Sequence, residues 1–129
     1  MPRIIITGAS DGIGAEMARQ LARNHGSQLQ LVLAARNAAN LESVALDCRS
    51  NQAQVWVVPT DVADEAQCRA LIAQSAQHCG GIDVLINNAG LGTSCKVIDM
   101  PDDEWNKVLD ITLTGTFRMT RAALKVMQP

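Results

Sequence analysis

One stretch near the N-terminus decides the fold: Ile4-Ile5-Ile6-Thr7-Gly8-Ala9-Ser10-Asp11-Gly12-Ile13-Gly14. Its β-branched beginning predicts a strand that is buried on both faces. The residues that follow predict a glycine-rich turn and then a helix with Ser10 or Asp11 as its N-cap. Backbone N–H groups at a helix start carry partial positive charge, and glycines without a Cβ let a phosphate approach them closely. The stretch therefore predicts a phosphate-binding loop between a strand and a helix.

This glycine spacing is not specific when it is taken alone. It also fits an ordinary strand-to-helix turn, and it differs from the G-x-G-x-x-G of the common dinucleotide fingerprint. No Gly-Lys-Ser/Thr follows, which excludes a Walker-type NTPase loop. A second motif, Asn87-Asn88-Ala89-Gly90, comes at the end of a later apolar run. Thr-Gly-x-x-x-Gly-Ile-Gly together with Asn-Asn-Ala-Gly resembles the short-chain dehydrogenase/reductase family, and both motifs match completely.

The composition is that of one domain with a hydrophobic core. The chain has 129 residues, of which 47% are hydrophobic, and a domain usually has about 100 to 200 residues. A net charge of −2 without any Lys/Arg cluster argues against nucleic acid or a membrane surface as a partner. The N-terminus has no secretion signal and no apolar run approaches the roughly 18 residues of a membrane span. We expect a cytoplasmic protein, and the four cysteines lack metal-ligand spacing, so we expect no metal.

Strand and helix patterns alternate along the chain. Apolar runs predict strands at 3–7, 29–35, 53–58 and 82–86. Helical spacing predicts a first helix that ends near His25, a second through 41–48, a third from a capping box at Asp64 and Gln67 to Cys79, and a long fourth one at 105–127 after the first turn at 101–104. Strands joined by helices are parallel with right-handed crossovers. We therefore predict an α/β fold, a Rossmann-like doubly wound parallel sheet with strand order 3-2-1-4, which holds its ligand where the order reverses.

The family resemblance implies which residues contact a nicotinamide dinucleotide. The glycine loop would hold the pyrophosphate, Asp61 and Val62 would lie at the adenine, and the Asn-Asn-Ala-Gly motif would line the adenosine ribose. The expected cofactor-binding residues are Gly8, Ser10, Asp11, Gly12, Ile13, Gly14, Arg36, Asp61, Val62, Asn88, Ala89 and Gly90. A plain turn or helix cap is the alternative role of Asp61. Asn87 is expected to tie neighbouring strands together.

The end of the second strand indicates which dinucleotide is bound. A protein that reads the free ribose of NAD is expected to place a carboxylate there, and this chain has Ala34-Ala35-Arg36-Asn37. A planar guanidinium suits a 2′-phosphate through bidentate, charge-assisted bonds. In the family, an arginine just after this strand accompanies NADP preference. We therefore expect NADP(H) to be preferred over NAD(H), with a solvated surface arginine as the alternative reading of Arg36.

The residues for the family's chemistry are missing from this sequence. That chemistry uses a tyrosine, a lysine one helical turn later, a serine and an asparagine. The chain contains no tyrosine and ends at Pro129, before the segment where the serine and Tyr-x-x-x-Lys follow in relatives. Thr112 occupies the family's asparagine position, and its hydroxyl is expected to bond back to the preceding helical turn and keep a local bend. We expect no catalytic residue here and a sheet truncated before strand five.

Three functions are compatible with these residues. The favoured one is the NADP(H)-binding portion of an oxidoreductase that transfers hydride between NADP(H) and a small alcohol or carbonyl compound. The second is a non-catalytic nucleotide-binding module, or the remnant of a truncated gene. The third, a structural or interaction protein, has the least support because all the cofactor motifs are retained. The last helix also has apolar residues that relatives cover with the second half of the fold or with a partner subunit, so the family resemblance implies a homo-oligomer through that helix.

Overall fold

The computed structural model describes residues 1–92 and 94–128. Thr93, which belongs to the predicted loop 91–100, and Pro129 lie outside the described residues. The elements follow the chain in this order: β1 (Arg3–Thr7), α1 (Gly12–His25), η1 (Gly26–Gln28), β2 (Gln30–Ala35), α2 (Ala38–Arg49), β3 (Gln54–Pro59), α3 (Glu65–Cys79), β4 (Val84–Ile86), η2 (Val97–Asp99), α4 (Asp102–Leu109), η3 (Asp110–Thr114) and α5 (Gly115–Met127).

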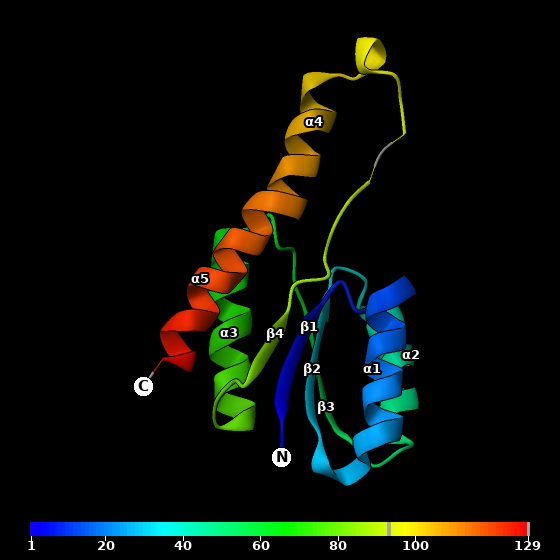
Figure 1. Ribbon diagram of the computed structural model, residues 1–129, viewed down its shortest axis with the longest axis vertical. Helices are drawn as coiled ribbons and strands as arrows, with labels where there is room; N and C mark the ends of the chain where they lie inside the picture. Colours follow the sequence, from blue (N-terminus) through cyan, green and yellow to red (C-terminus); the bar gives the residue numbers. More distant parts are fainter. Residues whose placement is uncertain (93, 129) are drawn as a thin grey trace.

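The four strands form one parallel sheet in the order β3-β2-β1-β4 (Figure 1). This confirms the predicted Rossmann-like arrangement and the order 3-2-1-4. In the register, Ile5 of β1 lies between Val32 of β2 and Leu85 of β4. The chain leaves β1 toward β2 on one side and returns to β4 on the other, so a crevice opens between the C-terminal ends of β1 and β4.

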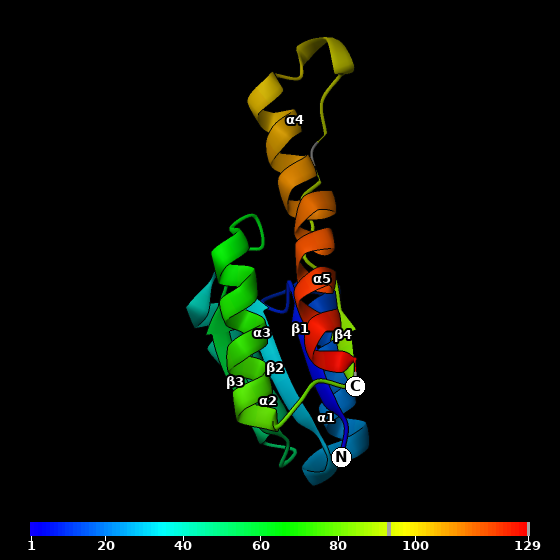
Figure 2. The same ribbon diagram turned by 90° about the vertical axis from the view of Figure 1, so that its left-hand side faces the viewer.

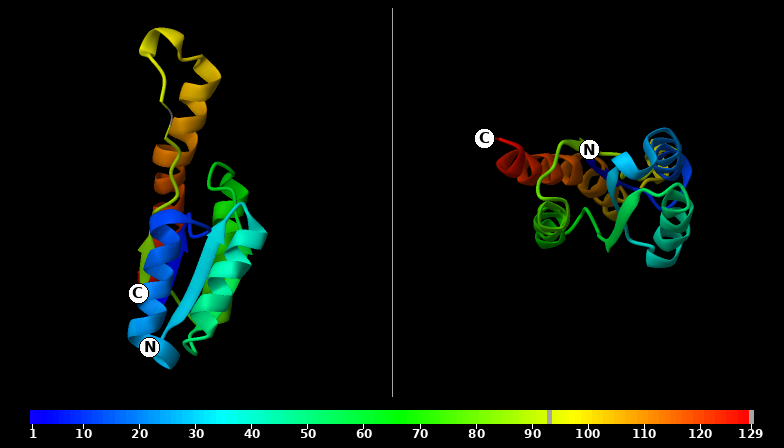
Figure 3. Two further views of the ribbon diagram at one scale, coloured as in Figure 1. Left: turned by 90° about the vertical axis from the view of Figure 1, so that its right-hand side faces the viewer. Right: turned by 90° about the horizontal axis from the view of Figure 1, so that it is seen from below.

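Helices cover both faces of the sheet. Side chains alternate along each strand, so Ile4 and Ile6 pack on the face covered by α1 and α2, whereas Ile5 packs on the face covered by α3 and α5 (Figures 2 and 3). The three isoleucines are buried, with Ile6 at 0% exposure. Burial on both faces explains why the strand sequences are continuously apolar rather than alternating. The centre of the sheet is therefore enclosed between two layers of apolar side chains.

Some predicted boundaries differ from the structure. The second and third strands begin one residue later than predicted, and β3 includes Pro59, which lies opposite Ala35. The fourth strand is shorter than predicted, because it begins at Val84 rather than Ile82. Just before β4, the Asp83 carboxylate accepts hydrogen bonds from the Arg3 side chain. The Asp83 N–H donates to the Arg3 carbonyl at 2.9 Å.

The long helix predicted over 105–127 is not one α-helix. It consists of α4, a π-helical turn (η3) and α5, and its first residue is Asp102, with Pro101 as the N-cap instead of a member of the first turn. The second half packs against α3, while α4 projects beyond the C-terminal end of the sheet (Figure 1), and no residue of α4 is buried. No helix in the described part of the chain is both long and apolar enough to cross a membrane.

Gly115, the first residue of α5, explains how closely this helix approaches the sheet. A Cβ on Gly115 would lie 3.0 Å from the carbonyl oxygen of Val62, the residue two positions after Thr60 in the loop that follows β3. Only a residue without a side chain lets the helix backbone come so near. The π-helical turn just before Gly115 is thereby held next to the loops at the C-terminal ends of the strands.

Candidate functional site

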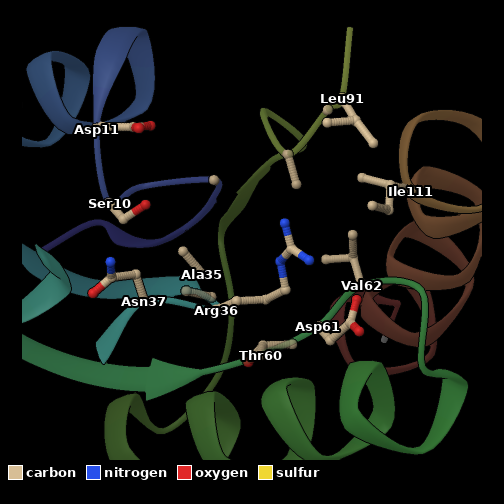
Figure 4. A pocket seen from close by; sticks show the side chains of 14 residues that line it. Ser10, Asp11, Ala35, Arg36, Asn37, Thr60, Asp61, Val62, Leu91 and Ile111 are labelled. Carbon is tan, nitrogen blue, oxygen red and sulfur yellow. The ribbon is translucent and has the colours of Figure 1, made fainter. Parts of the chain in front are cut away.

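The loops after all four strands meet around one pocket of about 260 Å³ at the C-terminal end of the sheet (Figure 4). The pocket lies at the carboxyl ends of the strands, which is the end where a doubly wound sheet binds its ligand. The π-helical turn adds one residue to its wall. The lining residues are Gly8, Ser10, Asp11, Ala34, Ala35, Arg36, Asn37, Thr60, Asp61, Val62, Ala89, Gly90, Leu91 and Ile111.

The three glycines of the first loop are needed for different physical reasons. Gly8 has φ +64°, and a Cβ there would lie 2.8 Å from the Cα of Ala89. Gly14 packs so tightly that a Cβ would run into the carbonyl oxygen of Gly8. Gly12 has φ +54° but nothing within 4 Å of the place of its Cβ. Gly8 and Gly14 therefore permit close packing, whereas Gly12 keeps the approach to the start of α1 open.

The N-terminus of α1 is not capped by a side chain. Asp11 is the N-cap residue, as predicted, and its carbonyl accepts the first helical hydrogen bond from the Ala15 N–H, but its side chain makes no cap hydrogen bond. The first turn also contains no acidic residue. The first N–H groups of a helix have no partner within the helix, and their partial positive charge favours an anion. The start of α1, next to the pocket, therefore has N–H groups without a side-chain cap and no acidic residue that would repel an anion.

Arg36 follows β2 directly, and its guanidinium lies within the pocket (Figure 4). Each of the other arginines makes an ion pair or a hydrogen bond with the protein: Arg3, Arg19, Arg23, Arg49, Arg69, Arg118 and Arg121. Among the described residues Arg36 is the one arginine that makes neither. A guanidinium offers five donors in a planar fork, and those of Arg36 have no recorded acceptor among the described residues.

Asp61 belongs to the turn between β3 and α3 and also lines the pocket. Its Oδ1 accepts a hydrogen bond from the Ala63 N–H at 2.9 Å, so the turn role considered from the sequence is real. Its own N–H donates to Oε1 of Gln67 at 2.8 Å. The predicted capping box is therefore only half formed. The Asp64 carboxylate accepts from the Gln67 N–H at 3.2 Å, but the side-chain Oε1 of Gln67 accepts from the Asp61 N–H instead of the Asp64 N–H. Val62, also predicted, lines the pocket beside Asp61.

The Asn-Asn-Ala-Gly segment is fixed to the glycine loop. The Asn88 side chain donates to the carbonyl oxygen of Gly8 at 3.0 Å, and the N–H groups of Asn88 and Ala89 both donate to the Thr7 hydroxyl, at 3.1 and 3.0 Å. Ala89 and Gly90 line the pocket, whereas Asn88 holds the loop in place. Asn87 donates to the Thr120 hydroxyl of α5 at 3.1 Å, so the prediction that it ties neighbouring strands together is wrong.

Most predicted site residues meet at the pocket, and the others support it or lie outside it. Gly14 and Asn88 pack the loop, Gly12 lies at the start of α1, and Ile13 is 75% exposed at the same end. No sequence pattern singled out Leu91 and Ile111, which are apolar wall residues from segments far apart in the chain. Asn37 had a detectable signal, because it caps α2 by accepting from the Asn40 N–H at 3.0 Å.

Thr112 does not bond back to its own helix, so that expectation is wrong. Its hydroxyl accepts from the Leu91 N–H at 3.1 Å and donates to the Leu91 carbonyl oxygen at 3.4 Å. Back-bonds of this kind are made instead by Thr116, whose hydroxyl donates to the Thr112 carbonyl at 2.8 Å, and by Thr120, whose hydroxyl donates to the Thr116 carbonyl at 2.7 Å. The helix therefore contacts the pocket wall through a side chain, and its local irregularity is the π-helical turn that contains Thr112.

Comparison with known proteins gives this geometry a family. The sepiapterin reductase of Chlorobaculum tepidum is 35% identical over 129 residues, which cover 97% of this chain and 53% of that protein. An alcohol dehydrogenase from the archaeon Thermococcus sibiricus, solved with 5-hydroxy-NADP, matches with a TM-score of 0.90 at 28% identity and covers 98% of this chain and 54% of that one. An NADH-dependent reductase complexed with NAD matches with a TM-score of 0.84 at 28% identity, over 97% of this chain and 51% of that one.

The chain spans about half the length of the relatives that it matches. The half that it spans contains the glycine loop, Arg36 and the Asn-Asn-Ala-Gly segment. The family model described as short chain dehydrogenase matches residues 2–129, which is nearly the entire sequence. The chain therefore belongs to the short-chain dehydrogenase/reductase family.

Proposed function

We propose that residues 1–129 form the NADP(H)-binding portion of a short-chain oxidoreductase, as an incomplete NAD(P)-binding Rossmann domain. The whole enzyme would transfer hydride between the nicotinamide of NADP(H) and a small alcohol or carbonyl compound. One observation carries the proposal: Arg36, the arginine without a protein partner in the described residues, faces the same pocket as the uncapped start of α1. Two separate anion sites in one pocket are what a dinucleotide with an extra phosphate requires.

The residues of the pocket fit the parts of that cofactor. The N–H groups at the start of α1 would hold the pyrophosphate, because Gly12 leaves that approach open. Arg36 would bind the 2′-phosphate by charge-assisted hydrogen bonds. Asp61 and Val62 would lie at the adenine, and Ala89 and Gly90 would line the adenosine ribose. The cofactor supplies the hydride, and this part of the chain supplies binding and orientation.

Calorimetry with NADPH and NADH tests this proposal. A charge-assisted contact between Arg36 and the 2′-phosphate predicts binding of NADPH roughly 10- to 100-fold tighter than binding of NADH. The variant Arg36→Ala should lose that preference while it binds NADH as the wild type does. Arg23→Ala is the matched control, because Arg23 pairs with Glu16 on the surface of α1, away from the pocket lining. Equal affinity of the wild-type chain for the two cofactors would refute the assignment of Arg36.

A non-catalytic dinucleotide-binding module is the second candidate, and the sequence itself favours keeping it. The chain contains no tyrosine, and Thr112 stands where the family has an asparagine. Positioned acid/base catalysis contributes about 10²- to 10⁴-fold to such a reaction. We expect the purified chain with NADPH and a panel of ketones to show no turnover above background. Turnover that is sensitive to mutation in the pocket would reveal a catalytic group that the family pattern does not include.

The exposed apolar face of η3 and α5 supports a homo-oligomer as the assembly. Leu113, Phe117 and Leu124 are 65%, 58% and 46% exposed and line a groove of about 540 Å³. The first turn of α4 is acidic, and the later part of α5 carries Arg121 and Lys125. Two copies that pair these helices antiparallel would therefore cover the apolar groove and match opposite charges. Sedimentation of Phe117→Glu as a monomer, against a wild-type dimer, is the expected result.

We also propose a cytoplasmic location. The cysteines Cys48, Cys68, Cys79 and Cys95 are all free in the structure, and free thiols are typical of reducing compartments. Burial raises the pKa of the thiols of Cys48, Cys68 and Cys79, which keeps them protonated and unreactive. Fractionation of cells that express the tagged protein would test this location.

A further inference from the structure

The segment 87–91 is fastened to two different parts of the molecule. On one side the Thr7 hydroxyl and the Gly8 carbonyl oxygen hold its middle, through Asn88 and Ala89. On the other side it faces the helix formed by η3 and α5. The residues between its ends, Ala89 and Gly90, are part of the pocket wall. Whatever fixes the two ends therefore determines where this wall lies relative to Arg36 and the start of α1.

Both ends of the segment are anchored by threonines of that helix, which follow one another at intervals of four. Asn87 donates to the Thr120 hydroxyl at 3.1 Å. Leu91 donates its N–H to the Thr112 hydroxyl at 3.1 Å and accepts from the same hydroxyl at 3.4 Å. The threonine between them, Thr116, donates only to the Thr112 carbonyl within the helix, at 2.8 Å. Thr112 thus holds the end of the wall that lies beyond the glycine-loop contacts.

The position of Thr112 in the π-helical turn makes this contact the critical one. In a π-helix the backbone bonds run from each N–H to the carbonyl five residues earlier, as the Gly115 N–H does to Asp110. The wider turn brings Thr112 up to the segment, and a Cβ on Gly90 would lie 3.9 Å from its hydroxyl oxygen. After Leu91 the chain runs toward α4, none of whose residues is buried. Thr112 thus holds Leu91, the last residue of this wall, through two hydrogen bonds.

We propose that Thr112 is a positioning residue for the dinucleotide pocket. It does not line the pocket. Its hydroxyl acts through Leu91, holding Ala89 and Gly90 at the separation from Arg36 that the bound dinucleotide needs. This inference rests on the proposed function of the pocket. It gives a task in cofactor binding to a position where the family's asparagine is absent.

Three variants of the 129-residue chain separate a positioning role from a general effect on the helix. Thr112→Val keeps the shape of the side chain and removes the hydroxyl. Thr112→Ser restores the hydroxyl without the methyl group. Thr116→Val is the matched control, because it removes a hydroxyl of the same helix that touches neither the segment nor the pocket. Two quantities are measured for each variant: hydrogen exchange of the Leu91 amide without ligand, and the dissociation constant of NADPH by calorimetry.

We expect Thr112→Val to exchange the Leu91 amide faster and to bind NADPH roughly three- to tenfold more weakly, the loss typical of one neutral hydrogen bond. Thr112→Ser should restore both values, and Thr116→Val should change neither. Unchanged exchange at Leu91 in Thr112→Val, or equal losses of affinity in Thr112→Val and Thr116→Val, would overturn the positioning role. If the proposed function is wrong, the wild-type chain will bind neither NADPH nor NADH. The exchange experiment would still decide whether Thr112 fixes Leu91.

Discussion

The two ends of the sheet differ in how many hydrogen bonds their arginine side chains make with the protein. At the N-terminal end, Arg3 donates from Nε and Nη2 to the two oxygens of Asp83 at 2.9 and 2.8 Å, and from Nη1 to the Gly80 carbonyl at 3.0 Å. The Arg3 N–H also donates to Asp83, and the Asp83 N–H donates to the Arg3 carbonyl. This set of contacts, which we name the Arg3–Asp83 clasp, joins the start of β1 to the start of β4.

At the C-terminal end, two groups beside the pocket have no side-chain partner among the described residues, although their neighbours Asp61 and Asn37 are hydrogen-bonded. Arg36 makes no ion pair or hydrogen bond with the described residues, and α1 begins without a side-chain cap. Arg3 is the first residue of β1, whereas Arg36 directly follows the last residue of β2, so the two arginines lie at opposite ends of the sheet. Polar groups with several partners, such as Arg3 and Asp83, join elements of the fold, whereas Arg36 and the start of α1 remain available to a ligand in our proposal.

The largest loss of stability is expected from substitution of Thr7, whose hydroxyl makes several hydrogen bonds at the C-terminal end of the sheet. Thr7 is 1% exposed, and its hydroxyl accepts from the N–H groups of both Asn88 and Ala89. Thr7→Val would leave these two donors without an acceptor, at about 1 to 3 kcal/mol for each unsatisfied group. We expect a loss of roughly 2 to 4 kcal/mol of unfolding free energy in urea melts, with Thr7→Ser close to the wild type. Wild-type stability of Thr7→Val would mean that this contact does not hold the loop.

A matched pair of glycines gives the next effect and compares the two ends directly. Gly12 and Gly80 have φ of +54° and +77°, and a Cβ at either would meet nothing within 4 Å. Alanine at either position should therefore cost about 1 to 2 kcal/mol of stability through backbone strain alone. Gly80 ends α3, beside the Arg3–Asp83 clasp, whereas Gly12 begins α1 beside the pocket. Only Gly12→Ala should also weaken NADPH binding, and equal binding losses in both variants would remove the distinction between the ends.

The smallest effect is expected from the Arg3–Asp83 clasp, because its charges are exposed to solvent. Hydrogen bonds from Arg3 lower the pKa of Asp83 from 3.8 to about 2. A carboxyl group with a lowered pKa in the folded state adds stability above its ordinary pKa, and that stability is lost as the pH falls from 3.8 through about 2. Asp83→Asn should therefore lower the urea midpoint at neutral pH and show a smaller further loss upon acidification than the wild type. Identical acid profiles would show that the clasp contributes nothing.

The sequence was sufficient to predict the framework because its signals are local and repeated. Continuous apolar runs such as 4–6 and the spacing of the helices led to the correct parallel sheet and strand order. Glycines at 8, 12 and 14 marked the loop because a positive φ and close packing leave few other residue types. Arg36 was found because it directly follows a strand, and the strand end fixes where its side chain begins.

The rest depended on contacts between segments far apart in the chain. A hydroxyl such as that of Thr112 can bond to its own helix or to a neighbouring loop, and only the π-helical turn decides in favour of Leu91. The amide of Asn87 likewise reaches α5 rather than a strand. The Gln67 side chain bonds to Asp61 rather than completing the capping box, because the turn after β3 places the Asp61 N–H 2.8 Å from its Oε1. Spacing in a sequence does not specify such choices among equivalent hydrogen-bond partners.

We propose that the dinucleotide binds at the C-terminal end of the sheet, beside Arg36 and the start of α1. Titration of the ¹⁵N-labelled chain with NADPH, followed by backbone amide chemical shifts, tests it most directly. We predict that the shifts concentrate at residues 12–14, 36–38 and 89–91, with none at Arg3 and Asp83. Shifts confined to the apolar groove of α5, or no shifts at millimolar NADPH, would contradict the account.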